Sequence, residues 1–399
     1  MNNIYKPVAA PVCNALVTAL PSGSIAGFEF DRLDFCGERL DAVAEWTAKQ
    51  AASGRVFNCA AGGRPFEQAE SIADSGQPLL LLCPSAPDCK PKLLAQAVRL
   101  CVQHGCTVFL GDFAAVVPGE LTGLLMRRML ESRVDLQLTF RECVNALDEV
   151  DTAYEPIIVN TKNRAIAELP ELRRRSGKLR RRILKRLAET CQINDEAGIT
   201  VSPLAELGAG CTLKPGTVLL GATRIGDGCT LGPNTLISNS KLGRGCVINS
   251  TQIYGSTLDD DVKIGPFCHV RPNSHLCSGV RIGDFVEVKN STVGERTKAS
   301  HLTYIGDSDV GAGVNFGCGT ITGNYDGVNH SRCVIGDGAF IGCNTSLVAP
   351  VSVGKLGYTA AGSTITQDVP DGALAICRAR EQVIKEGWGE RKLGEKNKL

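Results

Sequence analysis

One histidine stands where a regular repeat in this sequence changes phase. His301 lies in the stretch KASHLTYIGD, between small residues and close to Tyr304, in a chain of 399 residues with only five histidines. An imidazole titrates near neutral pH, so it can accept a proton or bind a metal ion, and it can also simply fill a repeat. The residues alone leave all three interpretations open.

Aliphatic residues recur every six positions through the C-terminal half of the chain. Many are followed at once by glycine, as in IGDGCT, IGDFVE and VGAGVN. Six residues make one short strand with its turn, and three such units close a triangular coil that needs its neighbours for backbone hydrogen bonds. The pattern predicts an all-β parallel β-helix of hexapeptide repeats. Its anchors are Leu207, Leu213, Leu219, Ile225, Leu231 and Ile237, then Ile264, Val270, Leu276, Ile282 and Val288, then Ile335, Ile341, Leu347, Val353, Thr359 and Ile365.

The segment GNYDGVNHSRC, residues 323–333, carries no anchor and interrupts the third run. We expect it to loop out of the coils, because interruptions of a solenoid commonly build its binding face.

The first 159 residues have a different character. The runs PLLLLC and CTVFLGD predict buried strands, and KPKLLAQAVRLCVQHG and PGELTGLLMRRMLESR predict helices. Strands that alternate with helices are typical of an α/β domain with a parallel sheet.

A basic helix with a break near Ser176 and Gly177 is predicted between Asn160 and Cys191, with nine basic residues from Arg173 to Arg186. A solvated connecting helix is favoured over a nucleic-acid patch, because no aromatic residue interleaves the charges. Its packed side is predicted to carry Leu179, Ile183, Leu184 and Leu187.

Composition excludes several classes of partner. The chain has 43 basic and 42 acidic residues, so it has no overall field that would gather nucleic acid or an anionic membrane. Its 18 cysteines are scattered and predict free thiols in a reducing cytosol. The sequence has no run of 18 apolar residues, so no membrane span is predicted and a soluble cytoplasmic protein is expected.

The block from Arg271 to Arg378 resembles the acetyltransferase domain of the bifunctional bacterial N-acetylglucosamine-1-phosphate uridyltransferases. The resemblance runs from about residue 155 to the end and includes the non-repeat pieces NFGCGTITGNYDG, HLTYIGD and KEGW. It implies a left-handed β-helix that forms homotrimers. It also implies that acetyl-CoA acetylates glucosamine 1-phosphate at sites between subunits, giving N-acetylglucosamine 1-phosphate for UDP-N-acetylglucosamine and cell-wall precursor synthesis.

Four regions follow from this resemblance. They are a degenerate, nucleotidyltransferase-like α/β domain (1–159), a basic linker helix (160–195), the left-handed β-helix acetyltransferase domain (196–370) and a tail that contributes to acetyl-CoA binding (371–399).

The resemblance also assigns roles to single residues. His301 is implied as the general base, which suits an amine that must be unprotonated when it attacks a thioester. Arg271 and Lys289 align with residues that hold the sugar phosphate, and Tyr304, Asn315 and His330 with residues that bind the sugar. The acetyl-CoA contacts carried over are Cys318, Asn324, Tyr325, Cys343, Ala361 and Arg378. No metal ligand is assigned.

Three of these positions depart from the usual pattern. Cys318 stands where alanine is common and Cys343 where serine is common, both at contacts expected to be made largely by backbone. His330 replaces a lysine that usually assists sugar binding, so weaker or pH-dependent binding is expected.

The N-terminal half lacks the family's uridyltransferase signature. The glycine-rich loop after the first strand is absent, and NCAAGGRPF (58–66) has a different spacing. Ser85 occupies the position of a metal-binding aspartate, and a hydroxyl cannot replace a carboxylate on Mg²⁺ at comparable affinity. Asn160 still matches the second metal position. A remnant without uridyl transfer is expected, with Mg²⁺ required only if that activity survives.

Three alternatives stay open. The chain could retain uridyl transfer as a bifunctional enzyme. It could be a zinc hydratase that uses His269, His275 and His301 across a trimer interface. It could also be a non-catalytic trimer that binds a sugar nucleotide.

Overall fold

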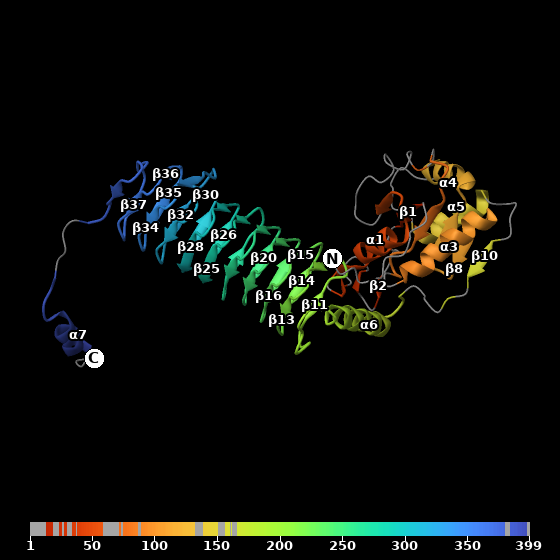
Figure 1. The fold of residues 1–399 in the computed structure, drawn as a ribbon, viewed down its shortest axis with the longest axis horizontal. Coiled ribbons are helices and arrows are strands. Elements are labelled where there is room, and N and C mark those ends of the chain that lie inside the picture. The colour runs from red at the N-terminus through yellow and green to blue at the C-terminus, as the bar shows by residue number, and fades with distance from the viewer. Residues whose placement is uncertain are drawn as a thin grey trace. The chain divides into compact units, whose positions relative to one another are not determined.

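The computed structural model describes residues 13–18, 24–25, 28–29, 34–36, 38–58, 72, 75–86, 89–131, 139–150, 156–159, 161, 166–379 and 384–396. The chain forms two compact units, residues 1–260 and 261–399. The first unit contains an α/β region and the first coils of a solenoid, and the second contains the later coils and a terminal helix (Figure 1).

The α/β region is built on one six-stranded sheet in the order β10-β8-β9-β7-β1-β6. The predicted parallel pairing is confirmed for β1 with β6 and β7 and for β8 with β10, whereas β9 is antiparallel to both β7 and β8. Only three residues separate β8 from β9, too few for the crossover that a parallel pair requires. The strands are β1 (Asn14–Val17), β6 (Val56–Asn58), β7 (Leu79–Leu82), β8 (Val108–Leu110), β9 (Ala114–Val117) and β10 (Ile157–Val159).

Helices pack on the sheet through two separate apolar clusters. The cluster around Leu80 and Val98 joins the sheet to α1 (Leu40–Ala51) and α3 (Pro91–His104). The cluster around Leu81 and Met126 joins it to α4 (Gly119–Glu131) and α5 (Phe140–Val150). The two predicted strands and the two predicted helices of this region are confirmed. Two short antiparallel pairs complete it, β2 (Ser24–Ile25) with β3 (Phe28–Glu29) and β4 (Asp34–Phe35) with β5 (Glu38–Arg39).

The basic segment forms one continuous helix, α6 (Leu169–Leu187), so the predicted break near Ser176 and Gly177 is wrong. A glycine inside a helix costs about 1 kcal/mol relative to alanine. Burial of the apolar side outweighs that cost, since the four residues predicted to pack, Leu179, Ile183, Leu184 and Leu187, are all buried.

The rest of the described chain is a parallel β-solenoid with sheets of 10, 9 and 10 strands, which we call sheets 1, 2 and 3 in the order used below. In the first unit, sheet 1 contains β11 (Thr200–Val201), β14 (Val218–Leu220), β17 (Leu236–Ser238) and β20 (Gln252–Tyr254). Sheet 2 contains β12 (Glu206–Leu207), β15 (Arg224–Ile225), β18 (Lys241–Leu242) and β21 (Thr257–Leu258). Sheet 3 contains β13 (Thr212–Leu213), β16 (Thr230–Leu231) and β19 (Val247–Ile248).

The second unit contributes further strands to each sheet. Sheet 1 contains β23 (His269–Val270), β26 (Glu287–Lys289), β29 (Tyr304–Gly306), β32 (Ile321–Gly323), β35 (Ser346–Val348) and β38 (Thr364–Ile365). Sheet 2 contains β24 (His275–Leu276), β27 (Thr292–Val293), β30 (Ser308–Val310), β33 (Cys333–Ile335) and β36 (Val351–Val353). Sheet 3 contains β22 (Lys263–Ile264), β25 (Arg281–Asp284), β28 (Lys298–His301), β31 (Asn315–Phe316), β34 (Phe340–Ile341), β37 (Tyr358–Thr359) and β39 (Leu374–Ala375).

All predicted anchors are buried, which confirms the hexapeptide coil. The change of phase has a simple cause. Arg281 pairs with Lys263 eighteen residues before it, whereas Lys298 pairs with Arg281 only seventeen before it. More than one coil is a residue short of three hexapeptides, since Asn315 in turn pairs with Lys298 seventeen residues before it. The left-handed sense implied by the resemblance stays a prediction.

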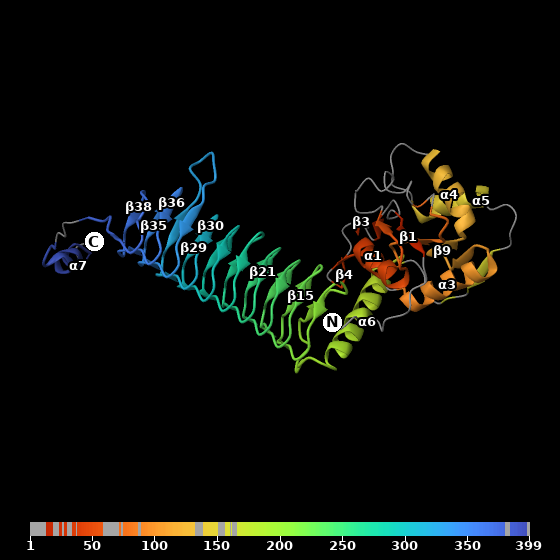
Figure 2. The same cartoon turned by 45° about the horizontal axis from the view of Figure 1, so that its top comes forward.

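The segment after β32 leaves the coil, as predicted, and returns at β33 (Figure 2). An antiparallel bridge joins Tyr325 to His330 within it. The chain ends in helix α7 (Trp388–Lys396). No helix in the described part of the chain is long and apolar enough to cross a bilayer. The 17 cysteines of that part are free thiols, as expected.

Candidate functional site

The predicted site residues His301, Cys318, Cys343 and Ala361 share one corner of the solenoid, at the ends of neighbouring strands of sheet 3. Lys298, Asn315, Phe340 and Tyr358 are successive partners in the ladder. The residue three positions after each of them is His301, Cys318, Cys343 and Ala361, respectively. The proposed base therefore heads the same column as three proposed acetyl-CoA contacts. Arg378 joins the far end, because its Nη1 donates to the Ala361 carbonyl oxygen at 3.0 Å.

The predicted phosphate and sugar residues Lys289 and Tyr304 lie on strands of sheet 1, and Arg271 directly follows its strand β23. Val270, Val288 and Ile305 point into the core, so their neighbours along the strands point outward. The register places Glu287 beside Tyr304 and Lys289 beside Gly306. Arg271 Nη1 donates to Glu287 Oε1 at 3.0 Å, an ion pair on the exposed face.

The side chain of Asp307, directly after β29, joins several of the predicted residues. Its side chain is only 6% exposed, and its Oδ2 lies 3.6 Å from Lys289 Nζ and 3.3 Å from His330 Nδ1. Asn324 Nδ2 donates to the same oxygen, and Asn290 Nδ2 donates to Oδ1 at 2.6 Å. One carboxylate thus holds a strand lysine and two residues of the loop after β32.

These contacts also set the charge state of Asp307. Burial by itself would raise the pKa of this carboxyl, but hydrogen bonds from Asn290 and Asn324 and the charges of Lys289 and His330 outweigh it and lower the pKa. The carboxylate is consequently ionised at neutral pH and fixes the positions of the Lys289 and His330 side chains.

Gly306 makes room for the ring of Tyr304. A β-carbon at Gly306 would come within 2.3 Å of the Tyr304 hydroxyl oxygen. With only hydrogen there, the ring lies over the backbone, and its hydroxyl oxygen comes within 3.5 Å of Asn324 Nδ2. Glycine at 306 therefore directs the tyrosine towards the Asp307 network.

The loop after β32 contributes a short aromatic stack. The rings of Tyr325 and His330 lie 4.8 Å apart, and the Tyr325 hydroxyl donates to the Gly327 carbonyl at 2.6 Å. Asn324 is buried, whereas Tyr325 and His330 are exposed. The structure therefore brings Asn324 and His330 to Lys289 and leaves the Tyr325 ring facing solvent.

Asn315 is not brought together with the other sugar residues. It lies on the outer face of sheet 3, whereas Lys289 and Tyr304 lie on sheet 1. His301 occupies the corner between these sheets, and its imidazole has no hydrogen-bond or ion-pair partner in the described part of the chain. One chain thus presents the predicted residues on two faces.

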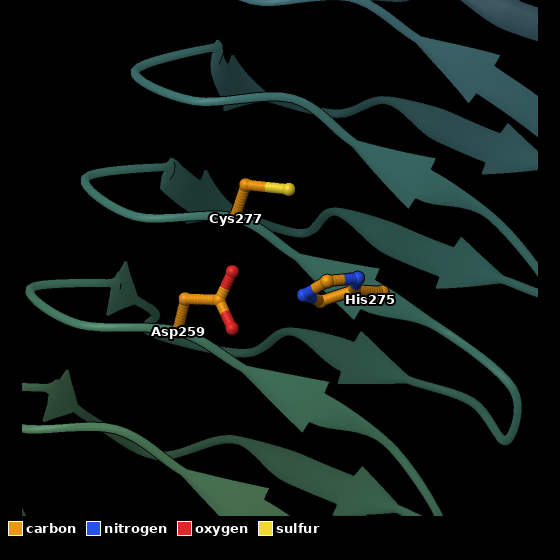
Figure 3. Close-up of side chains that lie close together, drawn as sticks. All are labelled: Asp259, His275 and Cys277. Carbon is orange, nitrogen blue, oxygen red and sulfur yellow. The ribbon is translucent and has the colours of Figure 1, made fainter.

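The three histidines of the zinc alternative lie on three different sheets. His269 is in β23 of sheet 1, His275 in β24 of sheet 2 and His301 in β28 of sheet 3. Figure 3 shows the side chains of His275 and Cys277, which come from one stretch of the second unit, and also Asp259 of the first unit. One chain therefore does not gather the three histidines around one ion.

The α/β region carries no carboxylate at the position of the family's metal-binding aspartate. Ser85 is 1% exposed, and its hydroxyl lies 2.9 Å from Cys83 Sγ. Burial raises the pKa of the Cys83 thiol, so the pair is neutral. Asn160 and residues 59–66 lie outside the described residues.

Sequence reasoning did not identify Asp307, although it ends the quoted motif HLTYIGD. The available signal was a carboxylate directly after an inward isoleucine and a glycine, where a solvated corner residue is the ordinary expectation. Its importance comes from partners 17 and 18 positions away, one coil before and behind it.

Comparisons with known proteins agree with the resemblance. No family model matches this sequence. The chain is 49% identical over 239 residues to the bifunctional protein GlmU of Caldicellulosiruptor saccharolyticus, which covers 60% of this chain and 50% of that protein. It is 52% identical over 187 residues to the bifunctional protein GlmU of Clostridium acetobutylicum, covering 47% and 41%. The chain spans about half the length of the curated relatives it matches.

Matches to solved structures are weak. A UDP-N-acetylglucosamine acyltransferase from Campylobacter jejuni is 16% identical with a TM-score of 0.24, covering 51% of this chain and 77% of that one. The Francisella novicida UDP-N-acetylglucosamine acyltransferase is 19% identical with a TM-score of 0.21, covering 45% and 65%. At these scores the two structures add nothing to the functional argument.

Proposed function

We propose that this chain transfers the acetyl group of acetyl-CoA to the amino group of glucosamine 1-phosphate. One observation carries the proposal: the column of His301, Cys318, Cys343 and Ala361 meets the cation-bearing face of sheet 1 at the corner between His301 and Tyr304. An acyl donor along the column and a phosphorylated sugar on sheet 1 would approach each other beside an imidazole.

The chemistry follows from those positions. The amine attacks the thioester carbonyl, a C–N bond forms, the C–S bond breaks, and the thiolate of coenzyme A leaves. His301 accepts the proton that the amine loses and can return it to the sulfur. Lys289 and Arg271 hold the sugar phosphate, and Asp307 acts as a positioning residue because it fixes Lys289, Asn324 and His330.

The catalytic unit we propose is a homotrimer with sites between copies. Support comes from Asn315, which lies on sheet 3 of the chain while the other sugar residues lie on sheet 1. A neighbouring copy could supply the missing face. Sedimentation analysis at several concentrations tests this, and a monomer with full activity would contradict it.

Uridyl transfer is proposed to be lost. The hydroxyl of the buried Ser85 is in contact with the Cys83 thiol and offers no charged ligand for Mg²⁺. Release of pyrophosphate from UTP and N-acetylglucosamine 1-phosphate, measured with Mg²⁺, would contradict the loss.

The direct test of acetyl transfer follows thiol release from acetyl-CoA with glucosamine 1-phosphate and other amino-sugar 1-phosphates. We expect saturable release with glucosamine 1-phosphate. Absence of release with every amino-sugar phosphate would overturn the proposed function. Binding of UDP-N-acetylglucosamine without any turnover would favour the non-catalytic alternative.

A further inference from the structure

Three cations form a column on the outer face of sheet 3 in the second unit. Lys263 pairs with Arg281, and Arg281 pairs with Lys298, each directly opposite on neighbouring parallel strands. All three side chains are exposed. Neighbouring strands lie about 4.8 Å apart. Like charges placed directly opposite one another destabilise a sheet, so this column carries an uncompensated cost.

Several cations elsewhere on this unit have an ion-pair partner. Arg271 lies 3.0 Å from Glu287, Lys289 lies 3.6 Å from Asp307, and Arg332 lies 2.6 Å from Asp309. Among the residues that the structure describes, Lys263, Arg281 and Lys298 have no such ion pair. The carboxylate of the same strand, Asp284, stands three residues beyond Arg281 at the other end of β25. The column thus places three cations without an ion pair side by side.

A cavity opens beside two of these cations. Its volume is about 340 Å³, and its lining includes no carboxylate. Arg296 adds a third cation, held only by an exposed ion pair with Glu295 at 3.3 Å, which is of little energetic value. The lining residues are Gly279, Arg281, Arg296, Lys298, Gly313, Val314 and Asn315.

The shape of the cavity depends on two glycines at the corner before sheet 3. Gly279 and Gly313 have φ angles of +71° and +67°, in the left-handed region. No atom lies within 4 Å of the place where a β-carbon on Gly313 would stand. That space is open to a ligand.

We propose that this cavity binds a small anion that carries more than one phosphate group. Arginine forks and a lysine ammonium match phosphate oxygens, and the three converging charges exceed what one carboxylate or one phosphate would neutralise. The lining holds no aromatic ring on which bases could stack, which argues against a nucleic-acid strand. Arg281, Arg296 and Lys298 have no role in the proposed acetyl transfer, whereas Asn315, which also lines the cavity, is a proposed sugar contact.

The test is titration calorimetry of the whole chain with inorganic pyrophosphate, without acetyl-CoA, so that a failed acetyl-transfer assay leaves it standing. We expect saturable binding that weakens as salt is raised, and weaker binding of inorganic phosphate. Arg281→Gln and Lys298→Gln should each weaken pyrophosphate binding about tenfold or more, because each removes a charge-assisted contact. A parallel titration with adenosine diphosphate identifies the kind of site. A site for bare phosphates should bind adenosine diphosphate and pyrophosphate with equal affinity, whereas a nucleotide site should bind adenosine diphosphate more tightly.

Two matched controls make the outcome decisive. Arg224→Gln removes an exposed arginine that already pairs with Glu206, and binding should stay unchanged. Arg271→Gln removes a proposed sugar-phosphate contact. Loss of pyrophosphate binding in Arg271→Gln but not in Lys298→Gln would overturn the proposal. So would unchanged binding in all variants, or a change only in self-association, which would make the column a contact between copies.

A stability measurement separates a ligand site from a structural role. Without ligand, Arg281→Gln should leave the melting temperature unchanged or raise it slightly, since it relieves repulsion from Lys263 and Lys298. A clear fall in melting temperature would assign the column to the fold instead.

Discussion

The α/β region and the solenoid each bury a polar side chain just past the end of a strand, with opposite consequences. Ser85, three residues after β7, has a side-chain contact with the thiol of Cys83 alone among the described residues, and the pair is neutral. Asp307, directly after β29, is surrounded by two amides, a lysine and a histidine. A buried charge persists only where partners satisfy it. Burial alone therefore does not mark a functional position; the donors around it do.

The largest expected effect comes from removing the base while leaving the Asp307 network intact. His301→Ala should lower the rate of acetyl transfer about a hundredfold or more, because the amine loses its proton acceptor. Thiol release at saturating substrate measures it. His104→Ala, at an exposed position in α3, is the matched control and should keep full activity. Unchanged turnover in His301→Ala would remove this residue from the base role.

Asp307→Asn tests whether the network positions the substrate groups. The neutral amide cannot hold Lys289 by charge and cannot replace the carboxylate contact to His330, so we expect KM for the sugar phosphate to rise about tenfold with a smaller change in kcat. A purely structural role would instead lower stability and leave KM alone. The conservative variant Asp307→Glu should recover part of the effect, and an equal loss in both variants would argue against a charge role.

Ser85→Asp places a buried carboxylate in the α/β region, as Asp307 is a buried carboxylate in the solenoid. No cation is found beside Ser85 in the described residues, so we expect the free energy of unfolding to fall by roughly 3 kcal/mol without any uridyl transfer. Denaturant unfolding measures the first and a Mg²⁺-dependent assay the second. Ser85→Ala is the control and should cost only about 1 kcal/mol. Restored uridyl transfer would show that the region kept the rest of that machinery.

The smallest expected effect is a pH dependence of stability. The pKa of Asp307 is lowered in the folded chain by its amide and cationic partners, which outweigh its burial. Its contribution is therefore fully present above the unfolded pKa, near 4, and is lost as the pH falls through the lower folded pKa. Denaturant unfolding between pH 6 and the acid limit of folding measures this. The free energy of unfolding should fall less steeply with decreasing pH for Asp307→Asn than for the parent chain. Identical slopes would contradict the assignment.

Much of the fold could be predicted because its signal is local. The six-residue anchors, the excursion after β32 and the packed side of α6 follow from residue type and period. The mixed sheet could not be predicted. The sequence of β9, AAVV, is a short apolar run that does not indicate whether the strand is parallel or antiparallel to its neighbours. The helix break at Gly177 was wrong because the cost of one glycine is small beside the burial of Leu179 and Ile183.

The candidate site was only partly accessible in the same way. The resemblance supplied His301, Lys289 and Tyr304 as separate residues, and spacing alone could not say which would meet. A coil of 17 residues in place of 18 decides which side chains are neighbours in the ladder. Asp307 gained its partners only through that stacking.

What the sequence by itself determined is the coil: aliphatic residues every six positions make an inward column, and glycines after them allow the corners. The tertiary structure alone decided the placement of charge. It set Lys289 and His330 on one buried carboxylate, and it left Lys263, Arg281 and Lys298 in a column without one. The physical reason is that electrostatic energy depends on distance through space between coils, and in a solenoid residues far apart in sequence lie directly opposite one another.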